Sequence, residues 1–261
     1  MSRSLDFQCA IVTGGAGGIG RAIAEDFLRR GKKVIIVGRT ESSLEKTAGE
    51  IGATAYYTLD TGSTSSIPAF IVTVTRDHPD VDCLVNNAGV QRPFEVFGKD
   101  YDFDLTKADE EIDINIRGPM HLTLGLLPHL AQKPTGGVVM NVSSVLGFIP
   151  FSIINPVYNG TKAWLHFWSI ALRKQLEQQG KNVKVVEIAP PSVESNLHRD
   201  RTDPDDNKKH KGASALSMEE FMEDVRKGWE AGDDLISAGM GKEIVQEWED
   251  TMGKRFKAMV K

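Results

Sequence analysis

The sequence contains little cysteine. Its 261 residues include only two cysteines, Cys9 and Cys83, and both stand in apolar segments that are typical of β-strands. In such positions a cysteine is usually a buried free thiol that behaves as a small apolar side chain. We therefore expect no disulfide framework and a reduced, cytoplasmic protein.

The chain also lacks a long apolar run, a recognisable signal peptide and an extended basic stripe. No segment is therefore expected to cross a bilayer, and we expect no membrane partner. The formal net charge of −5 and the absence of a basic stripe argue against nucleic acid as a partner. We assign no metal ligands.

The composition that remains is that of an ordinary globular protein. Hydrophobic residues make up 40% of the chain and charged residues 26%. A length of 261 residues favours one large α/β domain over two small ones. We predict a single domain over residues 1–261.

Residues 9–37 are predicted to form a strand, a glycine-rich turn, a helix and a second strand. The apolar runs 9–12 and 34–37 flank the unit, and the helix ends near Gly31. Glycines at such a turn let the backbone approach a pyrophosphate, whose charge the helix N-terminus stabilises. A tight turn without a ligand could use the same residues, but their position inside a β-α-β unit favours a dinucleotide site.

The end of the second strand bears on which dinucleotide binds. An acidic residue there would accept a hydrogen bond from the 2′-hydroxyl of NAD, whereas an arginine would bind the 2′-phosphate of NADP. The sequence has Arg39 after Gly38, and Glu41 follows closely. The charged arginine fork favours NADP(H) over NAD(H); an ordinary surface arginine is the alternative.

The alternation of strands and helices continues along the chain. Residues 54–58 and 83–85 are predicted strands, with a helix over about 63–76 between them. This repeat predicts a doubly wound, mostly parallel, Rossmann-like sheet flanked by helices, whose ligands bind at the carboxyl ends of the strands. Asp60 stands at one such end, where it could accept from an adenine amino group or simply stabilise a turn.

Tyr158 and Lys162 stand four residues apart, at the start of a stretch with helical apolar periodicity that ends at Gly180. On a helix the two side chains share a face. A lysine cation near the phenol should lower its pKa from about 10 toward the range that general acid–base catalysis needs. The pair alone could arise by chance, so its weight depends on the other motifs.

Together these motifs resemble the short-chain dehydrogenases/reductases in their compact single-domain form. The turn at 13–20, Asp60, the segment 86–89 and the Tyr158–Lys162 pair follow the family's order. The resemblance extends from about residue 8 to residue 195. It implies that the cofactor is bound by Gly14, Gly18, Ile19, Gly20, Arg39, Thr40, Asp60, Thr61, Asn87, Ala88, Gly89, Tyr158, Lys162, Val193 and Ser195.

The resemblance also implies a catalytic set formed by Asn115, Ser144, Tyr158 and Lys162. Asn115 would lie in a locally interrupted long helix and hold a water that links Lys162 to solvent; a capping or kink-filling asparagine is the alternative. Ser144 would hydrogen-bond the substrate carbonyl. The gap from Ser144 to Tyr158 is one residue longer than the family pattern, which leaves Ser143 as the other possible register.

Three stretches outside these motifs bear on the substrate. Residues 148–156 are unusually apolar for a loop, and we predict that they form a pocket wall with Phe94 and Phe97; core packing is the alternative. Pro191 stands where the family usually has glycine, so the backbone could follow a different route past the nicotinamide. Residues 200–212 are polar, which fits either a mobile loop over the site or a solvated excursion.

The C-terminal part departs from the usual family ending. Ser217 and Glu220 form a predicted capping box, a short strand is possible at 235–238, and a final amphipathic helix is expected over about 242–261. This ending resembles a little-characterised microbial branch of the family. We assign residues 196–232 to a substrate loop and helix.

The resemblance implies an NADP(H)-dependent oxidoreductase that transfers a hydride between the nicotinamide and a carbonyl or secondary alcohol of a small, mainly apolar substrate. Tyr158 would exchange the proton and Lys162 would bind the ribose. A non-catalytic NADP-binding regulator, or an isomerase or dehydratase that uses the same acid–base pair, remains as an alternative. The resemblance also implies a homodimer or homotetramer, but the sequence identifies neither the substrate nor the direction of the reaction.

Overall fold

A parallel β-sheet forms the centre of the computed structural model, which describes residues 3–94, 96, 104–211 and 215–260. Its strands follow the order β3-β2-β1-β4-β5-β6-β7. They are β1 Cys9–Thr13, β2 Lys33–Gly38, β3 Ala55–Thr58, β4 Val81–Asn86, β5 Gly137–Val142, β6 Val183–Ala189 and β7 Leu235–Ser237. The direction of winding reverses between β1 and β4, which is where doubly wound sheets bind their ligands. The predicted fold class is confirmed.

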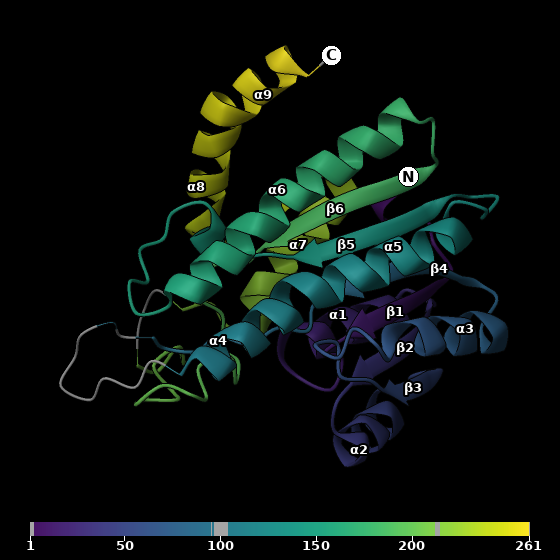
Figure 1. The fold of residues 1–261 in the computed structure, drawn as a ribbon, viewed down its shortest axis with the longest axis horizontal. Helices are drawn as coiled ribbons and strands as arrows, with labels where there is room; N and C mark the ends of the chain where they lie inside the picture. Colours follow the sequence, from purple (N-terminus) through teal and green to yellow (C-terminus); the bar gives the residue numbers. More distant parts are fainter. Residues whose placement is uncertain (1–2, 95, 97–103, 212–214, 261) are drawn as a thin grey trace.

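Helices cover both faces of the sheet (Figure 1). One face packs against α1 Gly18–Arg29, α2 Glu41–Ile51 and α7 Met218–Ala231, and the other against α3 Ile67–Asp77, α5 Gly118–Leu130 and α6 Pro156–Gln178. Successive residues of a strand point to opposite faces, so Ala10 and Val12 join the first core while Cys9 and Ile11 join the second. Cys9 and Cys83 are buried free thiols, as predicted.

A long helical segment between β4 and β5 contains an irregular turn. It consists of α4 Leu105–Ile112, the π-helical turn η2 Asp113–Arg117 and α5. Asn115 lies in this turn, so the local interruption predicted for its helix is confirmed. Such turns occur frequently at functional sites because they redirect side chains and backbone groups.

The C-terminal elements follow the expected order. α7 begins with a complete capping box between Ser217 and Glu220, and β7 adds to the edge of the sheet beside β6. α8 Gly241–Trp248, the π-helical turn η4 Glu249–Gly253 and α9 Lys254–Met259 then extend away from the sheet, beyond α6 (Figure 1). Two short 3-10 turns, η1 Arg3–Leu5 and η3 Val145–Gly147, complete the described elements. None of the helices in the described ranges has the length and apolar character needed to span a bilayer.

Candidate active site

A cavity of about 670 Å³ opens where β1, β4 and β5 end, beside the reversal of the strand order. Most residues that the sequence analysis assigned to the site line this cavity. They are Gly14, Gly18, Ile19, Arg39, Asp60, Thr61, Asn87, Ala88, Gly89, Ser144, Tyr158, Lys162, Val193 and Ser195. Gly20, Thr40 and Asn115 lie outside the lining.

The glycine-rich turn between β1 and α1 forms one part of the wall. Gly14 and Gly18 have φ angles of 67° and 52°, which glycine adopts without steric cost. α1 begins at Gly18 with no side-chain cap and no acidic residue in its first turn. Its first N–H groups are therefore left without a capping side chain, and this arrangement fits the binding of a pyrophosphate.

Asn87 ties this turn to the end of β4. Its Nδ2 donates to Thr13 O at 2.9 Å, and Thr13 Oγ1 accepts from the amides of Asn87 and Ala88 at 2.9 and 3.0 Å. A Cβ added at Gly20 would lie 2.4 Å from Asn87 Nδ2. Gly20 therefore allows α1 to pack closely against this junction, which is a supporting role and not a place in the cavity wall.

Arg39 and Asp60 line the cavity beyond the ends of β2 and β3. Arg39 is exposed, and none of the carboxylates in the described ranges forms an ion pair with it. Asp60 Oδ1 accepts from Gly62 N at 3.0 Å, so this residue stabilises its turn, and its predicted contact with an adenine amino group stays a prediction. Thr40 occupies the position before α2 and makes no capping hydrogen bond.

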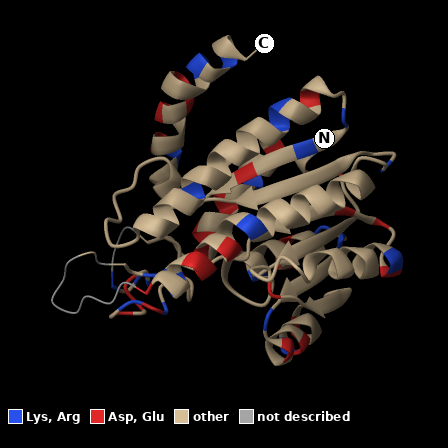
Figure 2. Ribbon diagram, in the orientation of Figure 1, with Lys and Arg blue, Asp and Glu red and all other residues tan. Residues whose placement is uncertain are grey.

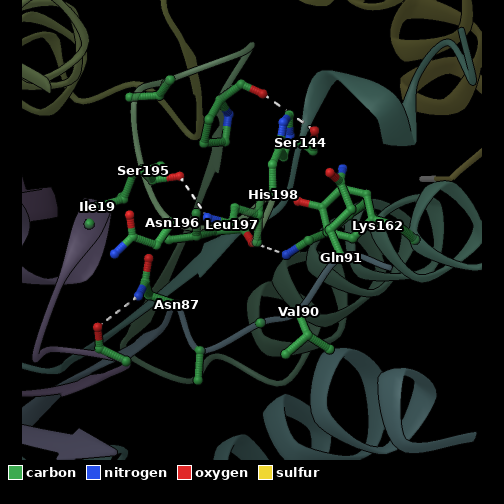
Figure 3. A pocket seen from close by; sticks show the side chains of 18 of the residues that line it. Ile19, Asn87, Val90, Gln91, Ser144, Lys162, Ser195, Asn196, Leu197 and His198 are labelled. Atoms are coloured by element: carbon green, nitrogen blue, oxygen red, sulfur yellow. Dashed lines mark hydrogen bonds between the residues drawn. The ribbon is translucent and has the colours of Figure 1, made fainter. Parts of the chain in front are cut away.

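Tyr158 and Lys162 lie near the start of α6, and each is only 5% exposed. Lys162 Nζ donates to Val142 O, at the end of β5, at 2.8 Å and lies 5.5 Å from the centroid of the Tyr158 ring (Figure 3). A Cβ at Gly147 would lie 2.7 Å from the carbonyl group of Lys162. Close packing and this hydrogen bond together hold the N-terminal part of α6 against the end of β5.

Burial sets the proton affinities of this pair. Burial raises the pKa of Tyr158 above its ordinary value, and the Glu111 carboxylate raises it further. The Ser144 hydroxyl and the Arg201 charge lower this pKa, but their effect is smaller. Burial lowers the pKa of Lys162 to about 8, against the effect of nearby carboxylates. The sequence argument expected a lowered pKa for Tyr158, and this is wrong for the structure because the loss of hydration dominates.

The two consecutive serines after β5 have different surroundings. Ser143 Oγ donates to Glu187 Oε1 at 2.5 Å, inside the core. Ser144 Oγ accepts from Leu146 N at 3.2 Å and donates to Pro190 O at 3.4 Å, a longer contact that a ligand could replace (Figure 3). Of the two registers, Ser144 is the one whose hydroxyl also affects Tyr158.

Asn115 is buried behind the cavity wall. Its Nδ2 donates to Val90 O at 2.9 Å and to Thr161 Oγ1 at 3.1 Å, and its Oδ1 accepts from Val90 N at 3.0 Å. The side chain therefore joins the segment after β4 to α6. The predicted role of Asn115 in holding a relay water stays a prediction.

Glu111 was not identified from the sequence, although it stands one helical turn before Asn115. It is fully buried at the end of α4, where its Oε2 accepts from Arg92 N at 3.0 Å. Its Oε1 has no hydrogen-bond partner among the residues that the structure describes. Burial raises its pKa to about 8. An acidic residue on the helix face of Asn115 is the signal that could have identified it.

Residues 195–211, which we call the covering segment, supply another wall of the cavity. Figure 3 shows Ser195 to His198 running from the side of Ile19 toward Ser144. Asn207 is 3% exposed and donates to Val193 O and Ser195 O at 3.1 and 3.2 Å. Part of the segment is therefore packed on the cavity, while residues 202–206 and 209–211 are exposed and carry both acidic and basic side chains (Figure 2). Gly212, the last residue of the polar stretch 200–212 singled out in the sequence, lies outside the described residues.

The predicted apolar wall is only partly realised. Phe151 lines the cavity. Phe94 is buried outside the lining, and the Phe148 ring packs against His166 with centroids 4.1 Å apart, so core packing describes these two residues. Phe97 lies outside the described residues.

The residues after β6, including the proline that replaces the family's usual glycine, line the cavity, and the predicted difference in backbone route stays a prediction. Pro191 and Val193 line the cavity. Val193 pairs with Leu216 in an isolated β-bridge. The hydrogen bonds of this bridge run from Glu194 N to Leu216 O and from Leu216 N to Ser192 O, so they do not use the Val193 amide. The predicted contact between the Val193 amide and a carboxamide is therefore compatible with the bridge.

The chain is similar in sequence to known proteins. Residues 8–206 match the short chain dehydrogenase family. The chain is 33% identical over 227 residues to the uncharacterized oxidoreductase DltE of Bacillus subtilis, covering 87% of this chain and 86% of that protein. It is 30% identical over 220 residues to the NADP-dependent 3-hydroxy acid dehydrogenase YdfG of Shigella flexneri, covering 82% and 86% of the two chains.

The fold also matches solved structures. A short-chain dehydrogenase from Sphingobium yanoikuyae in complex with NADPH superimposes with a TM-score of 0.80 over 97% of this chain and 95% of that one. The sequence identity of 22% means that this likeness shows the fold alone. The family match spans most of the chain and includes the glycine turn, Tyr158 and Lys162. The chain therefore belongs to the short-chain dehydrogenase/reductase family of oxidoreductases.

Proposed function

We propose that this protein is an NADP(H)-dependent oxidoreductase that interconverts a carbonyl group and a secondary alcohol in a small, mainly apolar substrate. The observation that carries the proposal is the convergence of Ser144, Tyr158 and Lys162 on the cavity that also contains the glycine-rich turn. A binding site for a dinucleotide and a set of proton-exchanging groups therefore share one space. That combination is what carbonyl reduction requires.

The residues of the chain fit the cofactor part by part. The turn with Gly14 and Gly18 and the uncapped start of α1 would hold the pyrophosphate. Lys162 would bind the nicotinamide ribose, and the Val193 amide would contact the nicotinamide carboxamide. When bound, the nicotinamide supplies or accepts the hydride.

The remaining chemistry belongs to the side chains. Ser144 would donate its hydroxyl hydrogen to the substrate oxygen and orient it. Tyr158 would exchange a proton with that oxygen, and its raised pKa keeps the phenol protonated at neutral pH, as a proton donor for carbonyl reduction must be. The Lys162 cation stabilises the negative charge that develops when the phenol gives up its proton.

The preference for NADP(H) rests on Arg39. Its exposed guanidinium lines the cavity without an ion-pair partner in the described ranges, so it can contact a 2′-phosphate without breaking another contact. The relative YdfG, named as NADP-dependent, supports the same choice. We infer an apolar substrate from the side chains of Val145, Leu146, Phe151 and Met240, which also line the cavity.

The test is a comparison of kcat/KM for NADPH and NADH, with a panel of small ketones and aldehydes. A charge-assisted contact should give a preference for NADPH of about 10- to 100-fold, and Arg39→Asp should remove it. Arg255→Asp is the matched control, because Arg255 is also exposed and lies in α9, outside the cavity lining. A better rate with NADH would contradict the cofactor assignment, and cofactor binding with no carbonyl-dependent oxidation of NADPH would favour a regulator or an isomerase.

The proposal also includes the cellular location and the oligomeric state of the enzyme. The two free buried thiols fit the reducing cytoplasm. We propose a homodimer or homotetramer, because Leu124 on α5 and Phe167 on α6 are large apolar side chains that remain 50% and 62% exposed.

A further inference from the structure

Arg201 is a cation of the covering segment that reaches the cavity shared by Ser144 and Tyr158. Its side chain is only 14% exposed, which is unusual for arginine. Its positive charge acts on Tyr158, where it favours the ionised phenol. The guanidinium therefore lies within electrostatic range of the group that would exchange the substrate proton.

Three side chains hold this guanidinium in place. Nη2 donates to Gln91 Oε1 at 2.8 Å and to Asn155 Oδ1 at 2.7 Å, and Nη1 donates to Asp206 Oδ2 at 2.7 Å. Gln91 and Asn155 are buried neutral amides, so they orient the charge without cancelling it. Asp206 forms an ion pair with Arg201, and this carboxylate is shared because it also contacts His198 Nδ1.

The Nε–H donor of the guanidinium is not satisfied. Arg201 Nε is buried and has no hydrogen-bond partner among the described residues. Buried charged donors without an acceptor are rare, because removing them from water carries a large free-energy cost. An acceptor supplied by a ligand would remove that cost, and a carboxylate oxygen is the acceptor that binds arginine most strongly.

We propose that Arg201 binds a carboxylate of the substrate, so that the substrates are oxo acids and hydroxy acids with a short apolar remainder. The inference rests on the proposed function. In that function Ser144 and Tyr158 bind the carbonyl of the substrate, and Arg201 would bind the same molecule at a second point. One anchor orients the reacting oxygen and the other fixes the far end, which together select a single pose for hydride transfer. The apolar remainder would pack against Leu146 and Phe151.

The experiment compares each acid with its methyl ester, which keeps the carbon skeleton and removes the charge. Short-chain hydroxy acids and oxo acids are assayed with NADP⁺ and NADPH in the wild type, in Arg201→Gln and in Arg201→Lys. We expect the wild type to prefer acid over ester by about 10- to 100-fold in kcat/KM, because the contact is charge-assisted. Arg201→Gln should abolish the preference, and Arg201→Lys should retain part of it.

The ratio of acid to ester separates binding of the carboxylate from general damage to the covering segment. A loosened segment lowers the rates of acid and ester together and leaves their ratio unchanged, which would overturn the inference. Lys211→Gln, which removes the same charge from an exposed position of the segment, should leave the ratio as in the wild type. If the wild type reduces esters and neutral ketones as well as it reduces oxo acids, the carboxylate anchor is wrong and the proposed function stands. If no carbonyl compound is reduced, the proposed function is wrong and the anchor is wrong with it.

Discussion

The two walls of the cavity are built on different physical principles. One wall, formed by the ends of β1, β4 and β5 and the start of α6, places buried side chains against strand backbone, as in the bond from Lys162 to Val142 O. The other wall, the covering segment, is held by side-chain contacts. Many of its ion pairs are exposed, such as Lys211 with Asp203, which are 41% and 50% exposed.

This difference suits the two walls to the different tasks that we propose for them. Proton exchange needs positions fixed to a fraction of an ångström, which regular elements provide. Selection among substrates benefits from a wall whose residues can change without damage to the core. Tyr158 and Lys162 accordingly lie on the first wall, and Arg201 lies on the second.

The largest expected effect comes from removing the reacting group of the first wall. Tyr158→Phe keeps the ring and its packing but deletes the proposed proton donor, so kcat should fall by about 10²- to 10⁴-fold. Binding of NADPH, measured by fluorescence titration, should stay close to that of the wild type. Tyr57→Phe is the control, since the Tyr57 hydroxyl contacts Asp77 away from the cavity. A Tyr158→Phe variant with more than about half of the wild-type kcat would refute the assigned mechanism.

The next-largest effect concerns the buried side-chain contacts of Glu187 behind the first wall. Glu187 accepts from Ser143 Oγ at 2.5 Å and lies 2.9 Å from His166 Nδ1, and all three side chains are buried. Glu187→Ala removes the acceptor at His166 Nδ1 and leaves Ser143 Oγ only its longer contact with Ile188 O at 3.4 Å, so the free energy of unfolding should fall by about 3 kcal/mol. Urea denaturation measures this free energy. Glu177→Ala, at an exposed position of α6, should not change the midpoint. If Glu187→Ala shifted the urea midpoint as little as Glu177→Ala does, the buried contacts of Glu187 would not be needed for stability.

The pH dependence of stability tests the same wall. The pKa of Glu111 is raised from 4.5 to about 8, so in this window the folded protein holds a proton that the unfolded chain releases. Stability should therefore fall as the pH rises from about 5 to 8, with a slope of up to about 1.4 kcal/mol per pH unit. The lowered pKa of Lys162, about 8 instead of 10.5, has the opposite sign and raises stability above pH 8.

Glu111→Gln isolates the contribution of this carboxyl group. The variant cannot ionise there, so the fall in stability between about pH 5 and pH 8 should become shallower than in the wild type. Urea denaturation at several pH values in that range provides the measurement. Parallel curves for the two proteins would mean that Glu111 is not buried in its neutral form.

Much of the first wall could be predicted because its signals are local. The apolar runs, the glycine turn and the spacing of Tyr158 and Lys162 each determine their own short stretch of backbone. The direction of the Tyr158 pKa could not be predicted, because it depends on burial by elements that are distant in the sequence. The position of Arg201 could not be predicted either: its contact with Gln91 joins residues separated by 110 positions.

A smaller effect is expected from the buried anchor of the covering segment. Asn207 holds the carbonyls of Val193 and Ser195, and Asn207→Ala would leave these contacts unmade at a cost of about 1–3 kcal/mol. Because the cost falls on a local unit, limited proteolysis within the segment should accelerate and KM should rise, while the global unfolding midpoint changes little. Asp205→Ala, an exposed change two positions away, is the control. Unchanged proteolysis of Asn207→Ala would show that this amide does not anchor the segment.

The smallest effect is expected where the covering segment is most exposed. Lys211 Nζ contacts both carboxylate oxygens of Asp203 at 2.7 Å, but water screens the two charges and holding both flexible side chains in one geometry opposes the attraction. Lys211→Gln should therefore change KM by less than about twofold and leave the proteolysis rate unchanged at low and high salt. If Lys211→Gln instead released the segment as much as Asn207→Ala does, exposed ion pairs and not the buried amide would hold this wall on the cavity.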